Sequence, residues 1–278
     1  TENDNMAIGY NALGGQISGG EYNIAIGNYS LDANVSGDYN VAVGYNSLTG
    51  NTAGNYVTAI GAKALQANTT GTGNTAVGTN AMESNTTGAS NTVMGWNALV
   101  TNTTGSNNLA MGVNTMFYNT TGYKNIALGD YGLWSNTEGM ENIAISGNSS
   151  LYKNTTGSQN IAIGAASLYN NETGNYNIAI GRSSLYSNTA SNNVGIGHES
   201  LKSNTTGYRN VALGYHGLWS NTEGMENVAI SGNSSLYKNT TGKQNVAIGA
   251  LSLYNNETGN YNIAIGRSSL YSNTASNN

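Results

Sequence analysis

One short pattern repeats along the whole chain. The Gly that closes each Ala-Ile-Gly-like triplet recurs 16 times from Gly9 to Gly266, nearly always 17 residues after the previous one. The working consensus is Asn-[Ile/Val]-Ala-[Ile/Val/Leu]-Gly-x-x-[Ser/Ala]-Leu-x-x-Asn-Thr-Thr-Gly-x-x, and residues 160–176 show it nearly intact. Because such a unit is too short for a helix pair, a leucine-rich repeat or a propeller blade, it predicts one coil of a β-solenoid.

Two kinds of irregularity interrupt the period. Ser146 and Ser231 each insert one residue inside the triplet, and single insertions of this kind predict β-bulges. On a larger scale, residues 123–193 match residues 208–278 with only 8 differences in 71 positions. This near-identity indicates a recent duplication. We therefore expect residues 1–278 to be one continuous repeat array, a piece of a longer fibre that grew by copying blocks.

The consensus also predicts where each coil is extended and where it turns. The Asn-Ile-Ala-Ile-Gly segment alternates and is β-branched, as strands are, and we expect a second short strand around the Leu. Gly and the Asn-Thr-Thr-Gly segment suit corners. The absence of Pro fits a fold in which nearly every backbone N–H donates to the neighbouring coil. The predicted fold class is all-β, a parallel β-solenoid (β-roll) of about 16 coils of 17 residues.

Large apolar residues fall in three columns of the repeat. An aliphatic or Thr residue lies three positions before the aligned Gly, an aliphatic or Met residue lies one before it, and Leu or Met lies four after it. The first two columns share one strand face, because side chains alternate along a strand. We expect the three columns to form the coil interior. The predicted core includes Ile26, Leu31, Ile60, Leu65, Ile163, Leu168, Ile248 and Leu253.

The middle residue of each strand is Ala in 14 of the 16 copies. It lies between the two aliphatic residues and therefore points to the opposite face. A solvent-facing column is expected to drift to polar residues, so a small apolar column indicates close packing against a partner chain. A crowded corner of a lone solenoid is the alternative. The predicted interface comprises Ala25, Ala42, Ala59, Ala76, Ala127, Ala162, Ala179, Ala212 and Ala247.

Two columns of Asn run the length of the array. One begins the strand and the other begins the Thr-Thr-Gly corner. Stacked identical amides hydrogen-bond from layer to layer in cross-β structures, so we predict two Asn ladders. They include Asn40, Asn74 and Asn91 in the first column and Asn68, Asn85 and Asn102 in the second.

These columns resemble the head repeats of trimeric autotransporter adhesins, which carry a similar Val/Ile-Ala-Ile-Gly strand followed by a spaced small residue and a Gly corner. They are equally similar to the Asn-Thr-Ala-Ile-Gly…Ala-Leu…Asn-Thr-Thr-Gly arrays of phage tail fibres and bacterial surface fibres. The resemblance covers the whole chain. It implies a left-handed parallel β-roll that forms a homotrimer about a long axis, although the adhesin repeats are usually shorter than these 17-residue coils.

Composition excludes several classes of function. The chain has 9 Lys and Arg against 14 Asp and Glu, a net charge of −5, and only 8% charged residues. Scattered basic residues do not supply the clustered phosphate contacts of a nucleic-acid-binding protein. No apolar run approaches the roughly 20 residues of a membrane span. Without Cys there is no disulfide framework and no Cys-based zinc site. We expect neither nucleic-acid binding nor membrane insertion by this segment.

The residues predict no enzyme, no cofactor and no metal site. The two His, His198 and His216, lie in different coils at variable positions, and we expect them to be exposed and to lack catalytic partners. Calcium-binding solenoids carry an Asp in every repeat, and this chain does not; an ion on a trimer axis stays an open alternative. Acidic pairs flank some Gly corners, with nothing to raise a pKa as a glycosidase requires. These pairs are Glu138 with Glu141 and Glu223 with Glu226.

Aromatic residues occupy many variable positions. Exposed rings can stack on sugars or on neighbouring fibres, or they can shield the coil or cover a subunit seam, and both interpretations stay open. The candidates for surface contact are Tyr45, Trp96, Trp134, Tyr169, Trp219 and Tyr254.

Several corners match the N-glycosylation sequon. We favour an Asn ladder that happens to match it, because an Asn needed inside a ladder is poorly placed to carry a sugar. The Asn residues concerned are Asn68, Asn85, Asn102, Asn119, Asn154, Asn171, Asn204, Asn239 and Asn256.

The leading hypothesis is a structural and adhesive function. We expect the shaft or head of an extracellular trimeric fibre, on a cell surface or a virion, that gives reach and multivalent contact. Its partners would be copies of itself, with surface glycans or a host or neighbouring cell surface as further candidates. The alternative is a free solenoid that binds ice or glycans, since Thr69, Thr86, Thr103 and Thr120 form a regular column.

Overall fold

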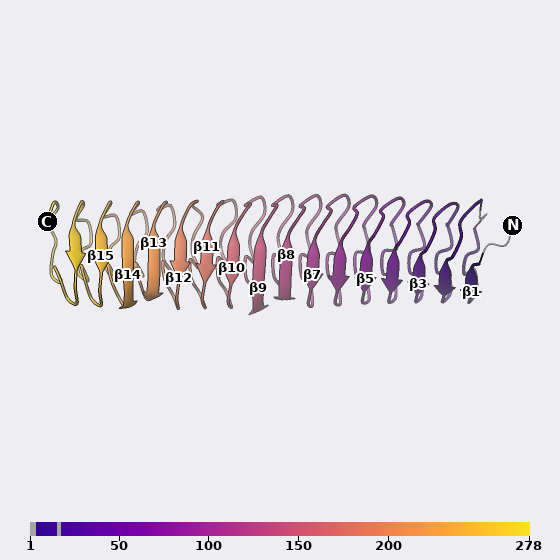
Figure 1. Cartoon of the computed structure of the whole chain (residues 1–278), viewed down its shortest axis with the longest axis horizontal. Coiled ribbons are helices and arrows are strands. Elements are labelled where there is room, and N and C mark those ends of the chain that lie inside the picture. The colour runs from indigo at the N-terminus through magenta and orange to yellow at the C-terminus, as the bar shows by residue number, and fades with distance from the viewer. Residues whose placement is uncertain (1–3, 16–17) are drawn as a thin grey trace. The chain divides into compact units, whose positions relative to one another are not determined.

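The computed structural model describes residues 4–15 and 18–278. In these ranges the regular elements are short parallel β-strands, one for each coil. The coils fall into two compact units, Thr1–Met140 and Glu141–Asn278. Within each unit the strands lie side by side in sequence order (Figure 1). The predicted all-β parallel β-solenoid with 17-residue coils is therefore confirmed.

The strands are short, and all but four of them span three residues. The first unit contains β1 (Met6–Ile8), β2 (Ile24–Ile26), β3 (Val41–Val43), β4 (Thr58–Ile60), β5 (Thr75–Val77), β6 (Thr92–Met94), β7 (Leu109–Met111) and β8 (Ile126–Asp130). The second unit contains β9 (Ile143–Asn148), β10 (Ile161–Ile163), β11 (Ile178–Ile180), β12 (Val194–Ile196), β13 (Val211–Tyr215), β14 (Val228–Asn233), β15 (Val246–Ile248) and β16 (Ile263–Ile265).

Neighbouring strands pair in a register that stacks equivalent repeat positions. Ala162 of β10 lies opposite Ala179 of β11, for example. The register of β13 and β14 shifts after Leu213, so that Tyr215 lies opposite Asn233. This shift confirms the bulge predicted at Ser231. The equivalent insertion lies in β9, which is lengthened to six residues like β14.

The Leu four residues after each aligned Gly lies in a turn. Leu31 and Leu65 have φ angles of 50° and 51°, and Tyr29 and Lys63, two positions earlier, both have φ of 59°. These are left-handed conformations, which are rare for such residues and incompatible with a strand. Hydrogen bonds between coils hold them, such as the one from the Leu65 N–H to the Ala81 carbonyl at 3.0 Å. The prediction of a second strand around the Leu is therefore wrong.

The interior of each coil is narrow and encloses one large apolar side chain. This is the Leu or Met of the turn, which is fully buried in all but the first and last coils, as predicted for Leu31, Leu65, Leu168 and Leu253. The aliphatic residue before the aligned Gly points outward instead. The assignment of Ile26, Ile60, Ile163 and Ile248 to the core is wrong, because they are 36–40% exposed.

The Ala column lies inside the coil. A coil that already encloses a Leu has room for a methyl group from the strand but not for an Ile, since interiors pack at crystal-like density. The strand therefore turns its smallest residue inward. The predicted interface residues Ala25, Ala42, Ala59, Ala76, Ala127, Ala162, Ala179, Ala212 and Ala247 all have 0% exposure. They cannot contact a partner chain, so this prediction is corrected.

Both Asn columns form the predicted ladders. At the corner, Asn68 Nδ2 donates to Asn51 Oδ1 at 2.9 Å and to the Gly71 carbonyl at 3.0 Å. The next rung repeats this pattern, with Asn85 Nδ2 donating to Asn68 Oδ1 at 2.8 Å. Asn102 continues it at 2.7 Å to Asn85. Both N–H groups of each buried side-chain amide are therefore hydrogen-bonded, and each amide joins two coils.

The ladder at the start of the strand uses the backbone as well. The backbone N–H of Asn91 donates to Asn74 Oδ1 at 2.9 Å, and Asn91 Nδ2 donates to the same oxygen at 3.1 Å. Asn40 Nδ2 and Asn74 Nδ2 donate to the carbonyls of Gly54 and Gly88, which lie 14 residues further along the chain. All six predicted ladder residues are fully buried.

The described residues contain no helix that is long and apolar enough to cross a bilayer.

Candidate functional site

From β2 to β16 each strand presents two aliphatic, Met or Thr side chains outward, one on each side of a buried middle residue, which is Ala in all but β6 and β12. We call this two-column surface the outer strand face. Ile24, Met94 and Ile196 on it are 37%, 49% and 37% exposed. In the second unit the face consists only of Ile, Val and Leu: Ile143, Ile145, Ile161, Ile163, Ile178, Ile180, Val194, Ile196, Val211, Leu213, Val228, Ile230, Val246, Ile248, Ile263 and Ile265. In the first unit the face also carries Thr58, Thr75 and Thr92.

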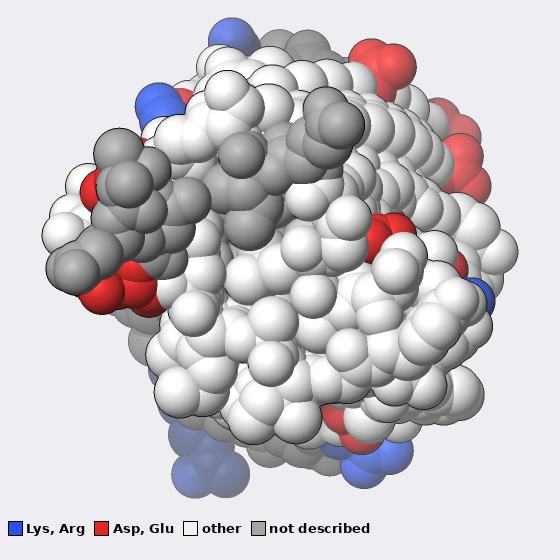
Figure 2. All heavy atoms as spheres, turned by 90° about the vertical axis from the view of Figure 1, so that its right-hand side faces the viewer, with Lys and Arg blue, Asp and Glu red and all other residues white. Residues whose placement is uncertain are grey.

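Charged side chains are sparse on the surface. In the view of Figure 2, most of the described surface is uncharged, and the Lys and Arg side chains do not gather into one patch.

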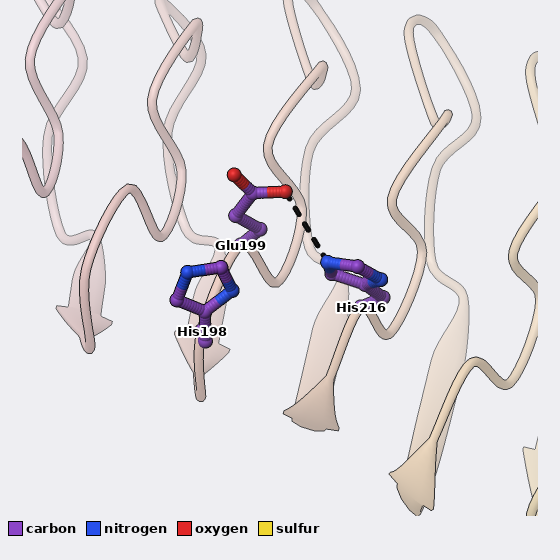
Figure 3. A group of neighbouring side chains, drawn as sticks. All are labelled: His198, Glu199 and His216. Atoms are coloured by element: carbon purple, nitrogen blue, oxygen red, sulfur yellow. Dashed lines mark ion pairs between the residues drawn. The ribbon is translucent and has the colours of Figure 1, made fainter.

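A second candidate site is a polar cluster in the second unit. His198 and Glu199 follow β12, and His216 follows β13 in the next coil (Figure 3). One ligand atom from each of the three residues lies within 4.8 Å of the others, and all three residues are half-buried. The sequence-based expectation of two separate exposed His residues is therefore wrong, because coil stacking brings them together.

Glu199 is the central residue of the cluster. Its Oε1 accepts a hydrogen bond from Lys202 Nζ at 2.7 Å, and its Oε2 accepts one from Trp219 Nε1 at 3.0 Å. Desolvation raises the pKa of Glu199, but these two hydrogen bonds and the charge of Lys202 more than offset it and lower the pKa to about 2. The carboxylate is therefore ionised at neutral pH.

The two imidazoles lie on either side of this carboxylate. His216 Nε2 is 3.2 Å from Glu199 Oε2. Burial lowers the pKa of His216, against the raising effect of Glu199. The His198 ring stacks on Tyr215 with centroids 5.4 Å apart, and its Nδ1 is buried without a hydrogen-bond partner among the described residues.

The repeat explains why these residues meet. They occupy the first and second positions after the aligned Gly, and equivalent positions of successive coils stack directly. In the duplicated block, Tyr215 and His216 replace Asp130 and Tyr131, so two of the eight differences between the blocks lie here. That local departure from the duplicated sequence is the signal by which the cluster could have been found from sequence.

The predicted aromatic contacts divide into two sets. Tyr169, Trp219 and Tyr254 belong to columns of stacked rings, in which Tyr169 lies 5.1 Å from both Tyr152 and Tyr186. Because neighbouring rings cover their faces, these side chains stabilise coil stacking. Trp134 likewise packs edge-on against Tyr118 at 4.7 Å.

Tyr45 and Trp96 form the second set and lie in a different column. They are 52% and 54% exposed and come immediately after the aligned Gly that ends β3 and β6, at the edge of the outer strand face. They are the more accessible candidates for contact with another surface.

The Thr column beside the corner is engaged in the fold. Thr69 Oγ1 donates to the Thr86 carbonyl at 3.0 Å, and Thr86 and Thr103 continue the pattern. Thr120 Oγ1 donates to the Thr137 carbonyl at 3.1 Å. These hydroxyls join coils and do not form a free outward array.

The Asn residues of the N-glycosylation sequons are buried. Asn68, Asn85, Asn102, Asn119, Asn154, Asn171, Asn204, Asn239 and Asn256 have 0% exposure. The acidic pairs at the corners make ordinary surface contacts, as where Glu226 accepts hydrogen bonds from Arg209 and Gln244.

A polar groove of about 470 Å³ runs along the corners of the second unit. Thr206, Glu223, Thr241, Lys243 and Thr258 contribute to its walls, and it does not include the His cluster.

No protein-family model and no curated protein sequence matches this chain. The functional conclusion therefore rests on the fold and on the residues described above.

Proposed function

We propose that this chain is a segment of an extracellular homotrimeric fibre that provides reach and multivalent surface contact. The observation that supports this most is the outer strand face, a two-column apolar surface repeated on every strand of each unit. Monomeric soluble proteins rarely expose contiguous apolar patches larger than a few hundred Å².

A parallel sheet normally has both faces covered. Here the inner face is covered by the turn Leu and the Asn ladders, while the outer face meets only solvent in the isolated chain. Even with both neighbouring coils present, Ile60 stays 40% exposed. Covering this face would remove two side chains per coil from water, nearly all of them apolar, at about 25 cal/mol for each Å² of apolar surface buried.

The occupant that fits this face is another copy of the chain. A partner that contacts every coil must present matching apolar groups at the same axial spacing, and a copy with the same 17-residue coils does so. Cyclic symmetry lets identical surfaces close around one axis. The resemblance to trimeric adhesin heads and fibre arrays supports three copies, with the outer strand face in place of the buried Ala column as the interface.

The resemblance also supports a location on a cell surface or a virion. A stack of near-identical coils adds length with each repeat and displays the same corners many times. Such repetition suits weak contacts that become strong together. Tyr45 and Trp96, at the edge of the outer strand face, and the polar groove of the second unit are the candidate contact surfaces for glycans or a neighbouring cell surface.

The mass of the purified chain in solution tests the proposal. We expect sedimentation equilibrium at micromolar concentration to give three times the chain mass of 28.8 kDa. A monomer at that concentration would contradict the trimer and favour a free solenoid. A thermal-hysteresis measurement on such a monomer would then test ice binding.

A pair of variants tests the interface itself. Ile161→Lys with Ile178→Lys places two charges on adjacent strands of the outer strand face, where we expect them to dissociate the trimer into folded monomers. The control, Thr156→Lys with Thr173→Lys, adds the same charges at exposed corners of adjacent coils and should stay trimeric. Equal masses for the two double variants would show that the copies do not meet on this face.

A further inference from the structure

We propose that His198, Glu199 and His216 bind one divalent transition-metal ion of the zinc class, as a clip between two coils of the second unit. The inference is independent of the proposed trimer, since all three residues belong to one chain. Two imidazoles and one carboxylate are a ligand set that holds Zn²⁺ in proteins and leaves a fourth position for water.

The spacing of the ligand atoms supports the site. Zinc lies about 2.0–2.2 Å from such nitrogen and oxygen atoms, so two ligands of a tetrahedral ion are roughly 3.3 Å apart. His216 Nε2 and Glu199 Oε2 already lie 3.2 Å apart. All three ligand atoms fall within 4.8 Å of one another.

The unsatisfied nitrogen of His198 is an independent observation. Its Nδ1 is buried and has no hydrogen-bond partner among the described residues. In Figure 3 one nitrogen of this ring is turned toward His216. A buried polar atom without a partner is destabilising, and coordination to an ion would satisfy it.

The neighbouring residues hold the carboxylate as outer-shell partners do in metal sites. Lys202 Nζ binds Glu199 Oε1 and leaves Oε2 directed to His216. Trp219 Nε1 donates to Oε2 at 3.0 Å, and Lys202 also lies 5.7 Å from the centre of the Trp219 ring. These contacts fix the orientation of the oxygen that would ligate.

The repeat supplies a natural contrast. The positions 85 residues before His198, Glu199 and His216 carry Val113, Asn114 and Tyr131, which do not form such a ligand set. We therefore expect one ion per chain, at the one group of three such ligands found among the described residues.

Equilibrium dialysis of the untagged protein against Zn²⁺, followed by elemental analysis, tests the site. We expect one zinc per chain, and Co²⁺ in its place should show the intense visible absorption of a tetrahedral ion. His198→Gln, Glu199→Gln and His216→Gln should each weaken binding at least tenfold. The matched control Glu226→Gln removes a carboxylate that pairs with Arg209 outside the cluster and should bind normally.

Circular dichroism of each variant without metal shows whether it still folds. A folded wild-type protein that retains no zinc would overturn the proposal, and so would stoichiometric binding that none of the three ligand variants weakens. The clip also predicts that zinc raises the melting temperature of the wild type and of Glu226→Gln, but not that of His216→Gln.

Discussion

Ala59 and Ile60 are neighbours in β4, yet Ala59 is fully buried and Ile60 is 40% exposed. The strand therefore turns its smaller apolar residue toward the coil interior and its larger one toward the surface. This relationship recurs along both units. It makes the outer strand face a candidate for contact between chains and leaves the interior to Leu, Ala and Asn.

Enlarging two neighbouring residues of β4, one at a time, tests this orientation. Ala59→Leu adds bulk between the stacked Ala42 and Ala76, and we expect it to lower the free energy of unfolding by about 1–3 kcal/mol, as overpacked interiors do. Thr58→Leu adds bulk on the outer strand face, where Leu109 holds the equivalent position of β7, and should not lower the free energy of unfolding. Urea unfolding followed by circular dichroism measures both. If Thr58→Leu instead lowered the free energy of unfolding more than Ala59→Leu, the Ala side of the strand would lie outside the coil.

The corner ladder should be sensitive to the loss of a single amide. Asn102→Ala removes hydrogen bonds to Asn85 Oδ1 and to the Gly105 carbonyl and takes from Asn119 Nδ2 one of its two acceptors, leaving it only the Gly122 carbonyl. We expect a loss of roughly 1–3 kcal/mol for each buried group left unsatisfied. Thr104→Ala, at an exposed position of the same corner, is the control in the same unfolding experiment. Similar midpoints for the two variants would show that the ladder adds little stability.

The aligned Gly is required by the close approach of successive coils. Gly61 has φ of +130°, and a Cβ on it would lie 2.5 Å from the Gly78 carbonyl oxygen. We expect Gly61→Ala to cost at least about 3 kcal/mol, from strain and overlap together. Gly73 also has a positive φ, but only Ser90 Oγ lies within 4 Å of its added Cβ. Gly73→Asn should therefore be tolerated, because Asn107 holds the equivalent position with φ of 60°; a comparable loss in both variants would contradict this explanation.

The buried corner Asn should not carry N-linked sugar in folded protein. Asn85 Nδ2 donates to both Asn68 Oδ1 and the Gly88 carbonyl, so attaching a glycan would break the ladder. We expect secreted, folded protein from a glycosylating host to show unmodified Asn85 by peptide mass analysis. Leu109→Thr creates a sequon at the exposed Asn107 and should be modified in the same host, which controls for access to the enzyme. A glycan on Asn85 in folded protein would rule out the ladder at that rung.

The ligand cluster illustrates what linear sequence conceals. His198 and His216 are 18 residues apart and lie in segments with no familiar metal-binding spacing. They meet because each coil stacks its post-strand residues on those of the next, and Glu199 joins them only through this stacking. The repeat period predicts such neighbours once the residues are compared column by column rather than along the chain.

The sequence by itself determined the period, the parallel stacking of coils, the two Asn ladders and the burial of Leu31 and its equivalents, because each depends only on which residues recur every 17 positions. Only the tertiary structure decided which strand face is inside and that the Leu turn is not a strand. Alternation defines two faces without saying which one is enclosed. That choice depends on the width of the closed coil, which holds Leu65 together with Ala59 and leaves no room for Ile60.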